Sequence, residues 1–206
     1  MSRSEVCIVN YGLGNLRSVE NGLRAIGADV RIVSKPEDIE SANRLLLPGV
    51  GSFYAGMKSL KEKGLDESIC LAVRKGTPLL GICLGMQLLA SQGGEGGDAQ
   101  GLGLIPGTVK RLSANLSLRI PHMGFNEVSQ LVTSPLFDSI DDRSDFYFVH
   151  SYHFVVDNQA DCLASSNYSE KFVAAVCRDN VFGTQFHPEK SQGQGLQLLK
   201  NFCTLK

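Results

Sequence analysis

Apolar residues follow two different rhythms along the first half of the chain. Short apolar runs at residues 6–10, 29–34, 44–47 and 78–82 predict strands. Between them, residues 16–26, 52–63 and 65–75 carry apolar side chains three and four positions apart, which predicts helices, and Gly27 is expected to end the first of these. Apolar strands that alternate with helices are typical of a parallel sheet covered on both faces.

The pattern changes after the glycine-rich stretch at residues 93–103, which we interpret as a mobile loop and not as a domain linker. Residues 108–112, 118–121, 146–149 and 154–156 predict short strands with little helix between them. Residues 172–177 and 181–186 flank the polar turn at 178–180, which is typical of a β-hairpin, and residues 196–202 predict a final helix. The expected fold is α/β: a single domain over residues 1–206 with a central, mostly parallel sheet, helices on both faces and an antiparallel, hairpin-rich second half.

The composition is consistent with one domain and restricts the classes of partner that we expect. The chain has 206 residues, of which 43% are hydrophobic, and its 20 Lys+Arg against 21 Asp+Glu give a formal net charge of -1. Neither sign forms a long block, so we expect no nucleic acid and no membrane surface as a partner. The N-terminus lacks a signal-peptide pattern, and the six scattered cysteines lack a CxxC pair. We therefore expect a reduced, cytoplasmic compartment, no disulfide framework and no metal or cofactor.

Cys83 lies where an apolar strand is expected to turn sharply into a helix, with Gly81 and Gly85 on either side. This GxCxG spacing is typical of a nucleophile elbow, in which glycines avoid clashes that a Cβ would cause. The start of the helix favours a thiolate, and the N–H of Leu84 is a candidate oxyanion donor. Most free cysteines are merely small buried hydrophobes, which is how we interpret the other five.

A thiol needs a base, because its ordinary pKa of about 8.5 leaves it mostly protonated at neutral pH. Among four histidines, His187 is the best candidate, since Pro188 favours an extended backbone in which His187 and Glu189 point the same way. A His-Pro-Glu tripeptide by itself is more often an ordinary strand end. Together with an elbow cysteine it predicts the Cys-His-Glu triad of a cysteine hydrolase.

The segment 48–51, Pro-Gly-Val-Gly, follows the third predicted strand, and its backbone N–H groups could approach a substrate carbonyl. By spacing alone this is a weak signal, because glycine after a strand is more often a turn. The pair Gly12 and Gly14 also lacks the third glycine of a dinucleotide-binding loop, so we expect no nucleotide site.

These segments resemble the class I (triad) glutamine amidotransferases, on GICLGMQ around Cys83, PGVG at 48–51 and FHPEKS around His187. Further segments (PGVGSF, IPHMGFN, YFVHSY and QFHPEKSQ) are similar to those of the glutaminase subunits of imidazole glycerol phosphate synthase, so the likeness covers nearly the whole chain. The resemblance implies that Cys83 attacks the amide of L-glutamine, His187 transfers the proton and Glu189 holds His187. It also implies the following sites: oxyanion-hole amides at Val50 and Leu84, and a glutamine pocket at Gly51, Gln87, His150, Ser151 and Tyr152.

The same resemblance implies a heterodimer with a (βα)8-barrel cyclase of histidine biosynthesis, which would receive the ammonia. The residues expected to contact this partner are His122, Met123, Phe125, Tyr147 and Lys190. Phe125 stands where the family most often has tryptophan, and this chain has no Trp. An indole N–H and some contact area are therefore absent. We also expect partner and substrate binding to activate the site, with the glycines beside Val50 easing a backbone rearrangement.

Three other readings remain open at this point. The chain could be the glutaminase of another synthase, such as the pyridoxal phosphate or anthranilate enzyme. It could be a stand-alone γ-glutamyl hydrolase or peptidase, which would need no partner. It could also be a scaffold that has lost its chemistry, although all three triad residues are present.

Overall fold

The structure, a computed structural model, describes residues 5–113 and 119–205. In chain order its first half contains β1 (Glu5–Val9), α1 (Leu16–Ala25), β2 (Asp29–Val33), α2 (Pro36–Glu40), β3 (Leu45–Gly49), α3 (Phe53–Glu62), α4 (Leu65–Arg74), β4 (Leu79–Cys83) and α5 (Leu84–Leu88). Its second half contains β5 (Gln92–Gly93), β6 (Ala99–Gln100), β7 (Gly107–Arg111), β8 (His122–Gln130), β9 (Ser144–His150), β10 (Tyr152–Val156), β11 (Cys162–Asn167), β12 (Lys171–Arg178), β13 (Val181–Thr184) and α6 (Gln192–Thr204), with short 3-10 helices η1 (Pro135–Phe137), η2 (Gln159–Asp161) and η3 (Pro188–Lys190).

Nine strands form one continuous sheet in the order β2-β1-β3-β4-β13-β12-β11-β8-β9. Neighbours from β2 to β13 pair in parallel, and neighbours from β13 to β9 pair antiparallel. A smaller sheet has the order β10-β7-β5-β6. The α/β fold class predicted from the sequence is confirmed, with parallel pairing in the half that the apolar strands form and hairpins in the other half.

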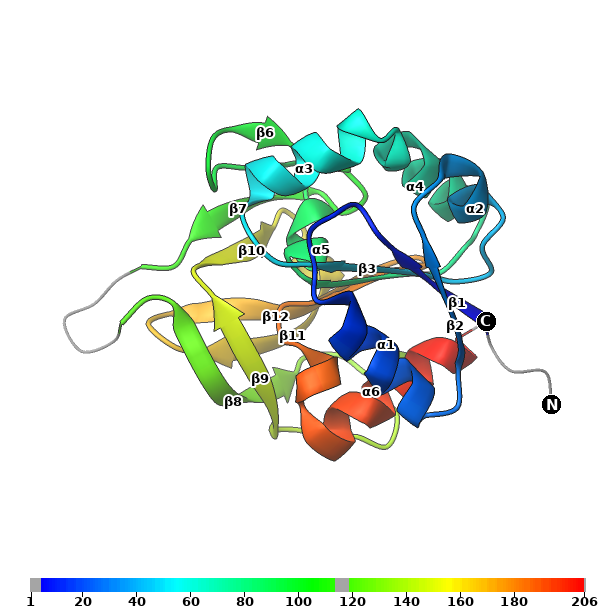
Figure 1. Cartoon of the computed structure of the whole chain (residues 1–206). Coiled ribbons are helices and arrows are strands. Elements are labelled where there is room, and N and C mark those ends of the chain that lie inside the picture. Colours follow the sequence, from blue (N-terminus) through cyan, green and yellow to red (C-terminus); the bar gives the residue numbers. More distant parts are fainter. Residues whose placement is uncertain (1–4, 114–118, 206) are drawn as a thin grey trace.

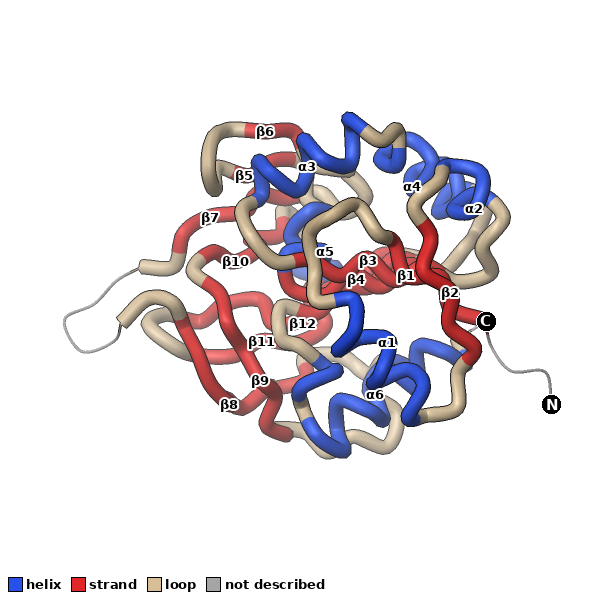
Figure 2. Tube along the Cα trace, in the orientation of Figure 1, coloured by secondary structure: helices blue, strands red, loops and turns tan. Residues whose placement is uncertain are grey.

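The large sheet separates two hydrophobic cores. Helices α1 and α6 lie together on one face, and α2, α3, α4 and α5 lie on the other (Figure 1; Figure 2). On the α1/α6 face, Leu23, Leu199 and Phe202 are fully buried, whereas Phe53 and Leu60 of α3 are fully buried on the opposite face. Each such side chain contributes roughly 2 kcal/mol to folding through its burial. Both faces of β1, β3 and β4 are therefore covered, as their apolar sequences predict, whereas the edge strand β2 is largely exposed.

Local signals explain where the helices begin and end. The side chain of Asn15 accepts a hydrogen bond from the N–H of Ser18 at the start of α1, and Ser52 does the same for Ala55 at the start of α3. Gly27, at φ +80°, follows the end of α1, as predicted. The predicted hairpin is also confirmed, since β12 and β13 pair antiparallel across residues 179–180.

Sequence patterns were wrong or silent where strands and helices are short or polar. Residue 118 lies outside the described residues, and residues 119–121 form no strand; β8 begins only at His122. The pattern also misses β11, whose Ser165 and Ser166 are buried, and α2, in which only Ile39 is buried. The pattern also predicts no strand in residues 93–103, where β6 and the end of β5 pair antiparallel. Strand β13 ends at Thr184, two residues before its predicted end.

Two further features concern the chain's environment. Within residues 5–113 and 119–205, no helix combines the length and apolar character needed to cross a membrane. All six cysteines are free thiols in the structure.

Candidate active site

Three adjacent parallel strands bring the predicted catalytic segments together. The loop at residues 49–51 follows β3, Cys83 ends β4, and His187 comes shortly after β13. Because these strands are parallel neighbours, their carboxyl ends lie at one edge of the sheet. Open α/β sheets bind ligands at this edge.

Cys83 has the backbone of a nucleophile elbow. It joins β4 directly to α5 with φ 55° and ψ -110°, a conformation that non-glycine residues rarely adopt. The flanking glycines are sterically required: a Cβ on Gly81 would lie 2.6 Å from the carbonyl oxygen of Gly85, and a Cβ on Gly85 would overlap the carbonyl oxygen of Leu47. The GxCxG spacing therefore reflects the close packing of β4, the start of α5 and the neighbouring strand β3.

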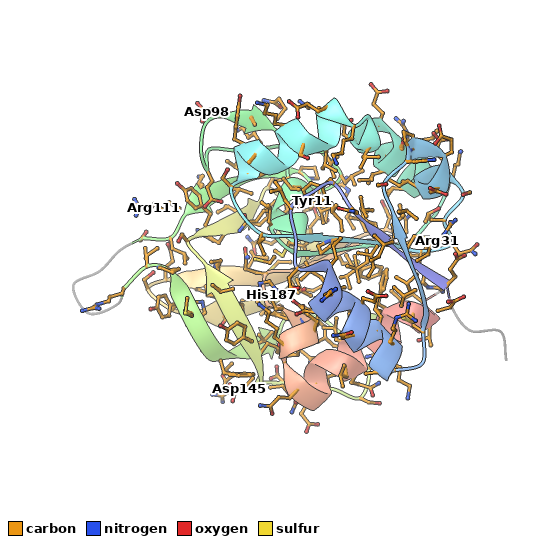
Figure 3. All side chains as sticks on the ribbon, in the orientation of Figure 1. Tyr11, Arg31, Asp98, Arg111, Asp145 and His187 are labelled. Atoms are coloured by element: carbon orange, nitrogen blue, oxygen red, sulfur yellow. The ribbon has the colours of Figure 1, made fainter. Side chains whose placement is uncertain are left out.

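His187, which precedes η3, and Glu189 within η3 form a buried pair. The Nδ1 of His187 lies 2.8 Å from Oε1 of Glu189, and only 4% and 2% of the two side chains are exposed. Burial by itself would lower the pKa of His187, but Cys83 and Glu189 together raise it to about 9. The N–H of His187 also donates to the carbonyl of Tyr147 at 2.9 Å, which fixes this segment against β9. His187 lies in the interior of the fold (Figure 3).

Cys83 and His187 face one cavity of about 260 Å³. Among the described residues, Nε2 of His187 is buried and has no hydrogen-bond partner. Cys83 therefore raises the pKa of His187 by its proximity, without a hydrogen bond of normal geometry. The thiol is held loosely instead, with Sγ 3.8 Å from the Val149 carbonyl and 3.8 Å from Nε2 of Gln185. His187 Nε2 is thus free to exchange a proton with a group bound in the cavity.

The cavity contains every residue that the sequence assigns to the oxyanion hole and glutamine pocket. Its lining is Val50, Gly51, Cys83, Leu84, Gln87, Glu95, Pro121, Val149, His150, Ser151, Tyr152 and His187. Gly51 has φ +107°, and a Cβ there would meet nothing within 4 Å, so this loop has room on its open side. Their roles toward a substrate remain predictions.

Two polar residues of this site were missed by sequence reasoning. Gln185 is fully buried, and its Oε1 accepts a 2.9 Å hydrogen bond from Nε2 of Gln87, which also donates to the Tyr152 carbonyl. Glu95 is the single carboxylate in the lining, and burial raises its pKa. A lone acidic residue between two Gly-Gly pairs was the available signal for Glu95. Gln185 gave none, because it reads as part of a strand.

The residues predicted to contact a partner separate into two sets. Met123 and Phe125 are 62% and 51% exposed on β8. Phe125 packs edge-on against Tyr147 with ring centroids 5.5 Å apart, and Nζ of Lys190 lies 5.7 Å from the Tyr147 ring. We call Met123, Phe125, Tyr147 and Lys190 the β8–β9 patch. Such a cluster of exposed aromatic, Met and basic side chains is typical of a protein interface.

His122 does not belong to this patch. Its side chain is only 2% exposed, because neighbouring residues on β8 point to opposite faces and His122 faces the core. There it stacks between Phe148 and Tyr168, at centroid distances of 4.8 and 4.1 Å. The prediction that His122 contacts a partner is therefore corrected: its ring is an internal group.

Comparisons with known proteins define the class first. The family model "Glutamine amidotransferase class-I" matches residues 7–205. Among solved structures, PurLQS from Thermotoga maritima is similar with a TM-score of 0.80, at 18% identity over 98% of both chains. A structure titled as a glutamine amidotransferase is similar with a TM-score of 0.74, at 21% identity over 95% of this chain and 96% of that one. The chain belongs to the class-I glutamine amidotransferase family and has its fold.

Curated relatives define the family more narrowly. Imidazole glycerol phosphate synthase subunit HisH 1 from Campylobacter jejuni (strain RM1221) is 48% identical over 97% of this chain and 100% of that protein. HisH 2 from Pseudomonas aeruginosa is 46% identical over 97% and 99% of the two chains, and HisH 2 from Methanococcus maripaludis is 43% identical over 96% and 98%. The chain belongs to the HisH family of imidazole glycerol phosphate synthase subunits.

Proposed function

We propose that this chain hydrolyses L-glutamine to glutamate and ammonia and delivers the ammonia to a (βα)8-barrel cyclase, with which it forms a heterodimeric imidazole glycerol phosphate synthase of histidine biosynthesis. The observation that carries the proposal is the cavity in which an elbow cysteine, Cys83, meets the buried pair His187 and Glu189. Membership of the HisH family supports the partner and the pathway.

Glutamine binding follows from the charges at the cavity. The α-ammonium group of glutamine needs an anion, and Glu95 is the carboxylate that lines the cavity. Gln87 is held by Tyr152 and Gln185, so its side chain is fixed beside the thiol. The substrate's side-chain amide would then lie over Cys83, with its oxygen toward the N–H groups of Val50 and Leu84.

The proposed chemistry has two halves. Sγ of Cys83 attacks the amide carbon, which forms a C–S bond, and His187 gives a proton to the nitrogen so that the C–N bond breaks and ammonia leaves. Water, losing a proton to His187, then attacks the thioester; the C–S bond breaks, and glutamate leaves with the thiol restored. Glu189 stabilises the positive charge that His187 carries in each half. No cofactor or metal takes part in these steps.

Ammonia leaves toward the partner in this proposal. The β8–β9 patch lies next to the cavity, because Val149 and His150 of β9 line the cavity while Tyr147 of the same strand belongs to the patch. A cyclase docked on the patch would sit close to the site of ammonia release. We also propose a cytoplasmic location, in keeping with the six free thiols.

The test is glutaminase activity in three states: the chain alone, the chain with the barrel cyclase, and the complex with the cyclase's nucleotide substrate. We expect turnover to rise at each step. Equal turnover in all three states would support a stand-alone γ-glutamyl hydrolase and contradict the partner. Stimulation by a pyridoxal phosphate or anthranilate synthase subunit, and not by the cyclase, would assign a different partner.

A further inference from the structure

Two buried histidines at the glutamine pocket are hydrogen-bonded to each other. Nδ1 of His122 is 3.0 Å from Nε2 of His150, and the two rings are 2% and 6% exposed. His150 lines the cavity with Cys83, whereas His122 does not. The hydrogen bond between them has a direction that the surrounding residues determine.

The first determinant is Asn126, on the outer side of His122. Its Oδ1 accepts from the N–H of Glu127 at 2.9 Å, and its Nδ2 donates to the carbonyl of Asn167 at 2.7 Å. These two bonds fix which end of the amide is nitrogen. Nδ2 of Asn126 lies 3.3 Å from Nε2 of His122, so this ring nitrogen must be an acceptor, and the proton of neutral His122 is on Nδ1.

The second determinant is the carbonyl of Tyr152, on the inner side of His150. Nδ1 of His150 lies 2.8 Å from this oxygen, and a carbonyl oxygen only accepts, so His150 carries its proton on Nδ1. Its Nε2 is then an acceptor and receives the Nδ1–H of His122. Both ends independently require the same order: Asn126 donates to His122, His122 to His150, and His150 to the Tyr152 carbonyl.

We propose that His122 is a positioning residue for the glutamine pocket, which acts through His150 by occupying the Nε2 lone pair and fixing His150 as the neutral Nδ1–H tautomer. The proposal deepens the glutaminase function proposed above and rests on it. It gives the buried His122 a role that contact with a partner cannot supply.

The chain of hydrogen bonds has a chemical consequence at the thiol. Two histidines, His150 and His187, line the cavity with Cys83. With its only lone pair occupied, His150 cannot accept a proton from Cys83, so His187 is left as the base. Burial agrees with this division, since it lowers the pKa of His150 to about 3 and that of His122 to about 4. His150 therefore adds no positive charge beside protonated His187.

The chain also continues to the nucleophile. The Tyr152 carbonyl that accepts from His150 accepts from Nε2 of Gln87 as well, at 2.9 Å. Gln87 in turn donates to Gln185, whose own Nε2 approaches Sγ of Cys83. A change at His122 would thus alter the orientation of Gln87, a pocket residue, without touching the substrate.

The direct test is the position of two protons. In long-range 15N–1H correlation spectra of the full chain with labelled histidine, alone and in the cyclase complex, we expect His122 and His150 each to show a protonated Nδ1 and an unprotonated Nε2 at neutral pH. A His122→Phe chain assigns the signals. A protonated Nε2 on either ring would overturn the proposal, whatever the enzymatic activity.

The kinetic test uses the same variant in the cyclase complex. His122→Phe keeps a ring between Phe148 and Tyr168 but removes the donor to His150. We expect the KM for glutamine to rise about tenfold, the cost of one buried hydrogen bond, with kcat changed less than about threefold. Turnover with added ammonium should be unchanged, which shows that the cyclase is intact, and a kcat for glutamine near the wild-type value shows that the variant is folded. His153→Phe, a buried histidine outside the chain of bonds, is the control and should keep the wild-type KM.

The outcomes separate the two proposals. A KM within about twofold of wild type in His122→Phe would overturn the positioning role, even if glutamine is the substrate. Absence of glutamine hydrolysis in the wild-type complex would instead reject the proposed function and leave the tautomers to be judged by the spectra alone.

Discussion

The parallel and antiparallel halves of the large sheet meet at β13, and they contribute different groups to the cavity. Strands β3, β4 and β13 place the 49–51 loop, Cys83 and His187 at their carboxyl ends. Strands β8 and β9 of the antiparallel half contribute the paired histidines, part of the pocket wall and most of the β8–β9 patch, and β10 of the smaller sheet adds Tyr152 to the wall. The proposed chemistry thus rests on buried parallel strands, and recognition rests on antiparallel strands that have one exposed face.

The nucleophile gives the sharpest test of this division. Cys83→Ala should lower glutamine-dependent turnover of the cyclase complex by at least about 1,000-fold, because no other group can form the thioester. Turnover with added ammonium should be retained. Steady-state assays with both nitrogen sources measure the two effects. Cys177→Ala, on antiparallel β12, is the matched control and should keep both activities. Glutamine hydrolysis by Cys83→Ala would mean that the triad assignment is wrong.

The tight packing of the parallel half predicts a stability effect. Gly85→Ala should lower the free energy of unfolding by about 3 kcal/mol, because the new Cβ overlaps the Leu47 carbonyl of β3. Chemical denaturation measures this. Gly193→Ala is the control: a Cβ there would meet nothing within 4 Å, so stability should hold or rise slightly. Equal midpoints for the two variants would contradict the close packing of the elbow.

The buried pair of His187 and Glu189 makes the proposed chemistry depend on pH. Since the pKa of His187 is raised to about 9, its proton is present at neutral pH and is lost as pH rises through that value. Glu189→Gln removes a charge that raises this pKa, so the alkaline limb of kcat/KM should move to lower pH and kcat should fall about 100-fold. A pH-rate profile measures both. Glu62→Gln, at an exposed position, is the control and should change neither quantity. If the alkaline limb of Glu189→Gln does not move, Glu189 does not set the pKa of His187.

The antiparallel half should affect association more than chemistry. Phe125→Ala should raise the Kd for the cyclase about tenfold, since aromatic side chains often contribute much of the binding energy of an interface. Titration calorimetry measures this, and glutamine hydrolysis in the saturated complex should remain. Val132→Ala, another exposed apolar position, is the control. If the two variants bind equally well, the β8–β9 patch is not the docking surface.

The sequence predicts the parallel half well, for physical reasons that the structure makes plain. In β3 and β4 every residue is buried, so apolar runs alone reveal the strands, and the glycines around Cys83 leave a spacing that can be read directly. In the antiparallel half the pattern is weaker. Strand β8 reads HMGFNEVSQ and only two of its positions are buried, so its sequence shows no clean alternation of apolar and polar residues.

The pocket wall illustrates what spacing cannot supply. His122 and His150 are 28 residues apart and meet only because β8 and β9 pair antiparallel, with His122 opposite His150 in the register. A resemblance on PHMGFN assigned His122 to the surface, but the alternation of side chains on β8 turns it inward. Gln185 and Glu95 required the folded chain for the same reason, since their neighbours come from distant segments.

The aromatic composition of the β8–β9 patch has a consequence for how an assembly could be observed. The chain contains no tryptophan, so it has no indole emission of its own. Any tryptophan fluorescence from a complex would originate in the partner subunit. Phe125 is an exposed aromatic position on the proposed docking surface, and an indole introduced there would be the single tryptophan of this chain, free of background from its other residues.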